Sequence, residues 1–248
     1  MSHHVVEVRD LHFTYPDGTE ALRGISFRLT HGEAMAIIGG NGAGKSTLLQ
    51  HLNGYHLPQR GEVRIGEIPV KATTVTAIRR SVGSVFQDAD DQLFMPTVFD
   101  DVAFGPLNFG LPAADVEARA TAALQRVGME HLRQRPPYKL SAGEKRAVAI
   151  ATVLAMTPDV LVMDEPSSNL DPRARRRLIE LLRSFEHTRI IATHDLELVV
   201  EVCPRVIVLD HGLIVAQGAT RAILNDEPLM LAHGLERPHS LRHLHPHG

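Results

Sequence analysis

The sequence predicts an α/β fold in which a mostly parallel sheet lies between helices and an antiparallel β lobe comes first. Two runs of alternating apolar and polar residues open the chain, as half-buried strands would. After Gly32, short apolar runs alternate with helical segments, which indicates parallel strands joined by helices. The length of 248 residues suits one large domain, or one domain and a small lobe.

Each element is predicted from a local pattern. The alternating runs at residues 5–13 and 22–29 are separated by a turn at 16–18. Gly128 provides a helix stop, Ser141 an N-cap and Pro172 a favourable first helical residue. The remaining expected elements are strands at 34–38, 82–86, 160–163, 189–192, 205–210 and 213–217, and helices from about residue 45 and at 112–128, 142–155 and 172–185.

The composition excludes several classes of protein. Lys and Arg number 26 and Asp and Glu 29, so the net charge of −3 gives no support to general nucleic-acid binding. The single cysteine, Cys203, excludes an intramolecular disulfide framework and a Cys-rich zinc site. No apolar run approaches the ~20 residues that cross a bilayer, and the N-terminus has no signal-peptide pattern. We therefore expect a cytoplasmic chain in which any membrane role needs a partner.

A glycine-rich loop directly follows the apolar run at 34–38 and opens the next helix. It fits the pattern G-x-x-x-x-G-K-[ST], whose glycines let the backbone wrap closely around phosphate oxygens. Backbone N–H groups and the helix N-terminus then face the anion, the lysine reaches the β- and γ-phosphates, and the serine binds Mg²⁺. The predicted nucleotide-binding residues are Gly39, Gly40, Asn41, Gly42, Ala43, Gly44, Lys45, Ser46 and Thr47.

A second signal is an apolar strand that ends in two carboxylates, Asp164 and Glu165. Beside the phosphate loop, Asp164 would lie near Mg²⁺ and bind it directly or through water. Glu165 would then polarise the attacking water. An acidic pair at a strand end is ordinarily unremarkable, and only the phosphate loop makes the functional interpretation the stronger one.

With these motifs in their expected order, residues 5 to 222 resemble the ATP-binding-cassette (ABC) ATPases. The resemblance implies the ABC-type fold of the phosphate-loop NTPases, with ATP and Mg²⁺ as cofactors. The further motifs that carry it are Tyr15, Gln87 after SVGSVF, the LSAGE segment at 140–144, the SSNLD segment at 167–171, and His194 after RIIAT.

The resemblance also implies roles for single residues. Tyr15 matches the aromatic residue that stacks on adenine, and Gln87 matches the glutamine that touches Mg²⁺ and water and links the site to the transport partner. His194 matches a switch histidine that contacts the γ-phosphate. The implied catalytic residues are Lys45, Gln87, Glu165 and His194, and the implied metal-binding residues are Ser46, Gln87 and Asp164.

The segment at 140–144 occupies the position of the family's signature, usually L-S-G-G-Q, in which Ser141 and the helix after it bind ATP held by a second subunit. A chain with one phosphate loop and one signature must pair head to tail with a copy of itself or a related ATPase. Ala142 and Glu144 replace the usual Gly and Gln, and Gly143 matches. Glu144 adds a negative charge near the nucleotide, and we expect hydrolysis to survive.

The stretches at 83–111 and 143–156 are similar to ATPases of energy-coupling-factor importers, particularly the cobalt and nickel group. This implies a peripheral ATPase at the cytoplasmic face of the cell membrane. Its implied partners are a second ATPase subunit, a transmembrane coupling protein and a substrate-binding membrane component, without nucleic acid. Cobalt is the favoured substrate; the alternatives are a nickel or vitamin importer of the same architecture, and much less a soluble non-transport ABC ATPase.

The predicted domains are an ATPase domain at 1–225, with a helical subdomain at about 90–157, and a His/Pro-rich tail at 226–248. Five of the 15 histidines lie in the last 16 residues, and clustered imidazoles can bind Ni²⁺ or Co²⁺. A loosely packed tail without function is the favoured interpretation. The arginines at 173 and 175–177 could contact acidic partners, but an exposed helix face is the favoured interpretation. For Asp88, Asp90 and Asp91, a solvated loop and a coupling role are equally weighted.

Overall fold

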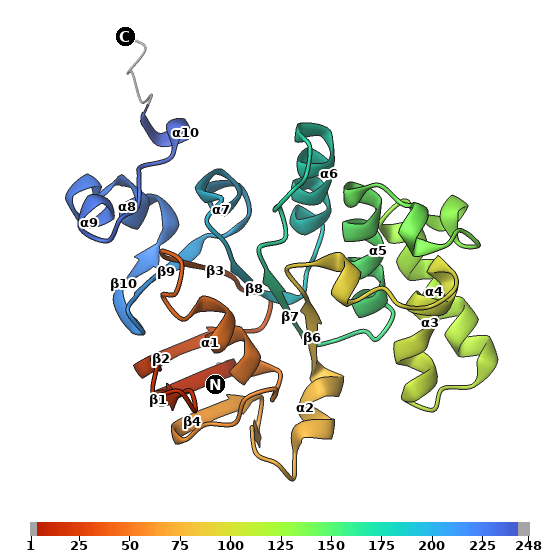
Figure 1. Cartoon of the computed structure of the whole chain (residues 1–248), viewed down its shortest axis with the longest axis horizontal. Coiled ribbons are helices and arrows are strands. Elements are labelled where there is room, and N and C mark those ends of the chain that lie inside the picture. Colours follow the sequence, from red (N-terminus) through yellow and green to blue (C-terminus); the bar gives the residue numbers. More distant parts are fainter. Residues whose placement is uncertain (1–3, 243–248) are drawn as a thin grey trace.

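The computed structural model describes residues 4–242, which form two sheets with helices packed around them (Figure 1). The strands are β1 (His4–Thr14), β2 (Glu20–Thr30), β3 (Ala34–Ile38), β4 (Arg60–Ile65), β5 (Ile68–Pro69), β6 (Val82–Val85), β7 (Val160–Asp164), β8 (Thr188–Ala192), β9 (Arg205–Asp210) and β10 (Leu213–Ala219). The α-helices are α1 (Lys45–Leu52), α2 (Val75–Ser81), α3 (Val98–Asn108), α4 (Ala113–Arg126), α5 (Ala142–Leu154), α6 (Pro172–Arg183), α7 (Leu196–Val202), α8 (Thr220–Asn225), α9 (Glu227–Ala232) and α10 (His239–Arg242). Three short 3-10 helices are η1 (Ala89–Asp91), η2 (Glu130–Leu132) and η3 (Pro137–Lys139).

The larger sheet has six strands in the order β10-β9-β3-β8-β7-β6. The pairs from β9 to β6 are parallel, and only β10 runs antiparallel to its neighbour β9. The prediction of a mostly parallel sheet between helices is therefore confirmed. Because the parallel strands all end at one edge, β3 and β7 deliver the phosphate loop and the two carboxylates to the same side of the sheet.

The smaller sheet is antiparallel and has the order β2-β1-β4-β5. The sequence predicts its first two strands, but β4 and β5 come from the connection after α1 and were not anticipated. Residues 60–65 read RGEVRI, in which charged and apolar side chains alternate over only six residues. Val63 and Ile65 are buried against the core, so the alternating pattern is that of a strand with one face in the core and the other exposed to solvent.

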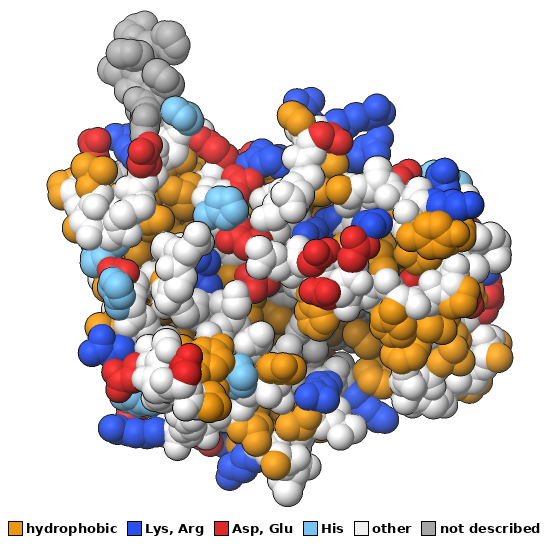
Figure 2. Space-filling model, viewed as in Figure 1, with side chains coloured by type: hydrophobic (Ala, Val, Ile, Leu, Met, Phe, Trp, Pro, Cys, Tyr) orange, Lys and Arg blue, Asp and Glu red, His pale blue; other side chains and the backbone are white. Residues whose placement is uncertain are grey.

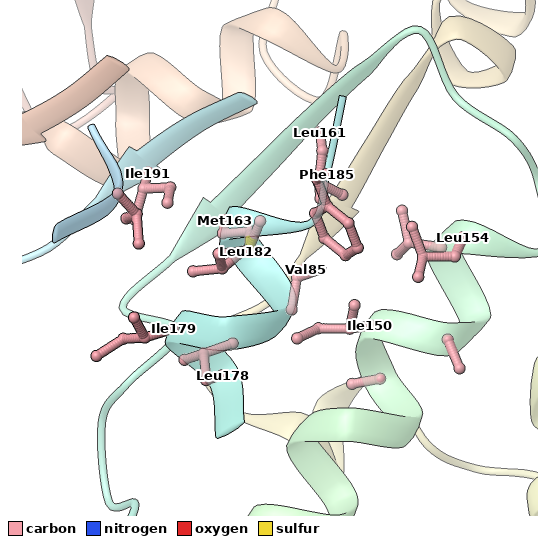
Figure 3. Close-up of a cluster of buried hydrophobic side chains, with 14 of the residues drawn as sticks. Val85, Ile150, Leu154, Leu161, Met163, Leu178, Ile179, Leu182, Phe185 and Ile191 are labelled. Atoms are coloured by element: carbon pink, nitrogen blue, oxygen red, sulfur yellow. The ribbon is translucent and has the colours of Figure 1, made fainter. Parts of the chain in front are cut away.

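The central strands β3, β7 and β8 are buried on both faces of the larger sheet, which explains their apolar character, whereas the edge strand β10 is only partly buried. Met35 and Ile37 of β3 pack with α1 and the antiparallel sheet, whereas Ala36 and Ile38 face the cluster of α3 to α8. Figure 3 shows the second cluster, in which side chains of α5 and α6 meet the strands: Val85, Ile150, Leu154, Leu161, Met163, Leu178, Leu182 and Phe185. Both faces thus hold the site-bearing strand ends in fixed positions.

Helices α3, α4 and α5 pack on one another beside the β6 edge of the sheet (Figure 1). They fall in the range predicted for a helical subdomain, while α3 itself was not anticipated because Gly105 and Pro106 interrupt its pattern. A Cβ at Gly105 would lie 2.6 Å from the Met156 side chain, so glycine allows this close packing. The domain boundaries remain a prediction.

The C-terminal segment differs from the expected loose tail. Residues 227–232 and 239–242 form α9 and α10, and Met230 and Leu241 are almost fully buried in the main core. His233 also contacts Asp210, with 2.9 Å between Nδ1 and Oδ2. A few well-placed apolar side chains suffice to anchor the segment although His and Pro dominate its composition. His243, His245 and His247 lie outside the described residues.

Within residues 4–242, no helix combines the length and the apolar character needed to cross a membrane.

Candidate functional site

The phosphate-binding loop at residues 39–44 joins the end of β3 to the start of α1. Two of its positions accept only glycine. At Gly39, with φ 154°, a Cβ would lie 2.0 Å from the carbonyl oxygen of Leu209, and at Gly44, with φ 105°, it would lie 2.5 Å from that of Ala21. The loop therefore fits tightly against its neighbours, and the first-turn N–H groups of α1 remain available to an anion.

The side chain of Lys45 folds back onto the phosphate-binding loop that precedes it. Its Nζ donates hydrogen bonds to the carbonyl oxygens of Gly39 at 2.8 Å and Gly40 at 3.0 Å, and the residue is nearly buried. The ammonium group thus lies at the loop, where a phosphate anion would be stabilised by its charge.

A cavity of about 310 Å³ lies at this loop. Its lining combines residues from four parts of the chain: Tyr15, residues 41–47, Gln87, Asp164 and Glu165. The structure therefore brings together the predicted residues of the phosphate loop and the acidic strand end. Tyr15 is fixed beside the loop by a 2.9 Å hydrogen bond between its hydroxyl and Thr47 Oγ1 and by edge-on contact with Phe13.

Ser46 and Asp164 place two side-chain oxygens at the cavity that could serve as metal ligands. Burial raises the pKa of Asp164, and the Ser46 hydroxyl acts against this shift by hydrogen bonding to the carboxylate. The described residues contain no group of three or more His, Cys, Asp or Glu that could hold a metal. Mg²⁺ that is bound largely through phosphates needs only one or two protein ligands, and hard oxygens such as these suit it.

Glu165 follows β7 in a strained backbone conformation with φ 45°. Its Oε2 accepts hydrogen bonds from Thr193 Oγ1 at 2.9 Å and from the backbone N–H of His194 at 3.2 Å. His194 Nδ1 lies 2.8 Å from the same oxygen, while the imidazole is largely exposed. This largely buried carboxylate, held beside the phosphate loop, has the position of a group that orients water.

Asp195 connects this histidine to α6. Arg175 donates two hydrogen bonds to it, from Nε at 2.7 Å and from an Nη at 2.9 Å, and Ser167 adds another. Burial alone would raise the pKa of Asp195, but the bonds from Arg175 and the backbone N–H of Leu198 outweigh burial and lower it. Arg175 is thus an ion-pair partner of Asp195 and not part of a merely solvated face, contrary to the sequence interpretation.

Gln87 is positioned through its backbone. Arg146 of α5 donates to the carbonyl oxygens of Phe86 and Gln87, both at 2.6 Å. Arg146 is 5% exposed, and burial lowers its pKa. Sequence reasoning missed this contact, because Arg146 directly follows Glu144 and Lys145 and reads as part of a charged, exposed first turn of the helix.

The signature residues lie apart from this cavity. Ser141 caps α5, Ala142 is exposed, and neither Ser141, Gly143 nor Glu144 lines the cavity at the phosphate loop. A Cβ at Gly143 would lie 2.8 Å from that of Ala174, so this glycine lets α5 approach α6. Ser141 and Gly143 of one chain therefore do not line the cavity at its own phosphate loop, although Leu140 and Ala142 line a neighbouring groove together with Ser46 and Asp164.

Comparisons with known proteins agree with this geometry. A model of the family described as ABC transporter matches residues 22–168. A protein of Geobacter sulfurreducens named as an ABC transporter ATP-binding protein is 63% identical over 98% of this chain and 97% of its own length. The energy-coupling factor transporter ATP-binding protein EcfA of Methanocaldococcus jannaschii is 46% identical over 90% of this chain and 82% of its own. The solved structure of CbiO1 from Clostridium perfringens, part of the transporter complex CbiONQ, superposes with a TM-score of 0.83 at 39% identity, covering 93% of this chain and 94% of that one.

Proposed function

Because the chain belongs to the ABC transporter family and is an ATPase with relatives of the energy-coupling-factor type, we propose that it powers an importer of cobalt ions. The observation that carries the catalytic part is the nearly buried Glu165 carboxylate beside the phosphate loop. The cobalt assignment rests on the similarity to CbiO1, which belongs to a CbiONQ complex.

In the proposed cycle, Lys45 and the loop bind the phosphates of ATP, while Tyr15 stacks on adenine. Ser46, Asp164 and Gln87 would hold Mg²⁺, which neutralises phosphate charge when bound. Glu165 accepts a proton from the attacking water, and His194 contacts the γ-phosphate. The hydrogen bonds of Thr193 and His194 to Glu165 Oε2 fix the carboxylate for this task.

A second ATPase subunit completes each site. The separation of Ser141 from the phosphate loop of the same chain supports a head-to-tail pair, in which each signature meets the nucleotide of the other subunit. Closure on two ATP molecules and reopening after hydrolysis would supply the motion that drives transport.

The proposed membrane partner docks beside Gln87. A groove of about 890 Å³ there includes Tyr55, Phe86 and the acidic side chains of Asp88, Asp90 and Asp91. Nearby Phe94 and Phe104 are exposed and contact each other edge-on, with ring centroids 5.0 Å apart. Figure 2 shows acidic side chains over η1 and apolar ones gathered over α3.

Exposed aromatic side chains next to a groove lined by charged residues, here acidic ones together with Lys145 and Arg146, are typical of a protein-binding site. A transmembrane coupling protein that carries a substrate-binding component would hold this chain peripherally at the cytoplasmic face of the membrane.

The catalytic proposal is tested by Glu165→Gln. This change keeps the size of the side chain and removes the charge that accepts a proton, so ATP binding should persist while turnover falls at least about a hundredfold. Titration with a fluorescent ATP analogue and a phosphate-release assay measure the two quantities. The matched control Glu227→Gln, at the start of α9, should retain full turnover. Wild-type turnover in Glu165→Gln would refute the role of Glu165.

The transport proposal is tested by metal uptake. A strain that lacks the gene should take up radioactive Co²⁺ more slowly, and the intact gene, but not the Glu165→Gln gene, should restore uptake. If the intact gene instead restores uptake of Ni²⁺ or of a vitamin, the alternative importers are favoured. Unchanged uptake of all three, with the protein recovered away from membranes, would favour a soluble ABC ATPase.

A further inference from the structure

The carboxylate of Glu144 caps the N-terminus of α5, the helix that follows the signature serine Ser141. Glu144 Oε2 accepts hydrogen bonds from the Ser141 backbone N–H at 2.8 Å and from the Ser141 hydroxyl at 2.9 Å. The backbone N–H of Glu144 in turn approaches Ser141 Oγ at 3.4 Å. This reciprocal capping box commits the hydroxyl proton of Ser141 to Glu144.

The surroundings keep this carboxylate charged. The hydrogen bonds from the Ser141 backbone and hydroxyl hold the pKa of Glu144 below its usual value, and the positive charges of Arg135 and His131 lower it further. The N-terminus of the 13-residue helix α5 favours a negative charge as well. The Glu144 carboxylate therefore already accepts the hydrogen bond of the Ser141 hydroxyl, which is a donor that a phosphate would use.

We infer that Glu144 is a built-in competitor of ATP: nucleotide held by the partner subunit binds this helix only after the Glu144 carboxylate has released Ser141. This inference rests on the proposed head-to-tail pair. A serine hydroxyl has one proton to donate, and it cannot serve Glu144 and a phosphate oxygen at once. The two anions also repel each other when both lie at the same helix end.

The competition should set how much ATP is needed to close the pair. An uncharged amide at position 144 can accept the same hydrogen bond from the Ser141 N–H and keep the cap. Two unit charges about 4 Å apart in water change an equilibrium by roughly fivefold. Since a symmetric pair contains two such contacts, Glu144→Gln should tighten ATP-dependent pairing by roughly five- to twenty-fivefold.

The test uses the full chain with Glu165→Gln, so that ATP is not consumed. Sedimentation velocity at several protein concentrations, with MgATP and without nucleotide, gives the pairing constant of this parent and of the parent carrying Glu144→Gln. The matched control is Glu67→Gln, which makes the same charge change in the turn between β4 and β5. Thermal unfolding checks that each variant is folded.

We expect tighter pairing for Glu144→Gln only, a smaller gain at high salt because exposed charges are screened, and unchanged ATP affinity of the single chain. Equal pairing constants for the parent and the Glu144→Gln variant would overturn the inference while leaving the paired ATPase intact. An equal gain for Glu67→Gln would overturn it too, because net charge would then be the cause. If the parent fails to pair in MgATP, the proposed pair fails, and the inference fails with it.

Discussion

Arg146 offers the sharpest test of how the fold holds the candidate site. Its guanidinium donates two 2.6 Å hydrogen bonds to the backbone of Phe86 and Gln87, and the side chain is 5% exposed. Each such charge-assisted bond is worth about 1.5–3 kcal/mol, so two supply about 3–6 kcal/mol before the cost of burying the charge. That cost offsets a large part, and replacement by the apolar Met should lower the free energy of unfolding by about 2 kcal/mol.

The catalytic effect of Arg146→Met should exceed its effect on stability. The loop that carries Gln87 loses its anchor, and a displacement of about 1 Å in a catalytic group can reduce the rate a hundredfold. Urea unfolding and steady-state ATP hydrolysis measure the two effects. The matched control is Arg133→Met, which removes an ion pair to Glu117 and a stacked contact with Phe99 in the same helical region. Normal turnover in Arg146→Met, beside a stability loss of the expected size, would refute the positioning role.

Three further predictions concern the phosphate loop, a buried histidine and the ion pair between Arg175 and Asp195. Gly39→Ala should lower stability by at least about 2 kcal/mol in thermal unfolding, because its Cβ would lie 2.0 Å from a backbone oxygen, whereas Gly40→Ala has open space and should be neutral. Burial lowers the pKa of His51 to about 4, below its unfolded value near 6.5, so the unfolded chain binds the extra proton first. The wild type should lose about 3 kcal/mol more stability than His51→Asn between pH 7 and pH 4. Arg175→Ala should lower the free energy of unfolding by about 1–2 kcal/mol at pH 7. The loss should be smaller below pH 4, because the ion pair stabilises the folded chain only while Asp195 is ionised.

Sequence patterns predict those elements whose formation depends on residues close together in the chain. The phosphate loop is recognisable because Gly39 and Gly44 satisfy backbone demands that few other residues meet. The capping position of Ser141 is likewise a short-range property, and the structure has it at the N-cap of α5. Strand β4 was missed because its pairing with β1 lies across α1 in the sequence. Long-range pairing leaves only a weak trace in six residues.

The site divides in the same way. Lys45, Ser46, Asp164 and Glu165 follow from motifs, and the structure brings them to one cavity. The residues that hold the machinery in place do not follow, because their partners are distant in sequence. Arg175 reaches a carboxylate 20 positions away, and Arg146 reaches the Gln87 loop 59 positions away. Sequence periodicity carries no information about such contacts.

Helix α5 joins the two halves of the proposed cycle. Its N-terminal Ser141 would meet the partner's nucleotide, and Arg146, five residues on, holds the loop of this chain's own Gln87. Five helical residues span only about 7.5 Å, so both contacts lie on one rigid segment. We therefore expect a shift of α5 toward the partner's ATP to move Gln87 in this chain's own site. If so, Arg146→Met should reduce the cooperativity of hydrolysis with ATP concentration as well as its rate. If the rate falls while the cooperativity is unchanged, Arg146 acts only on the site of its own chain and does not couple the two sites.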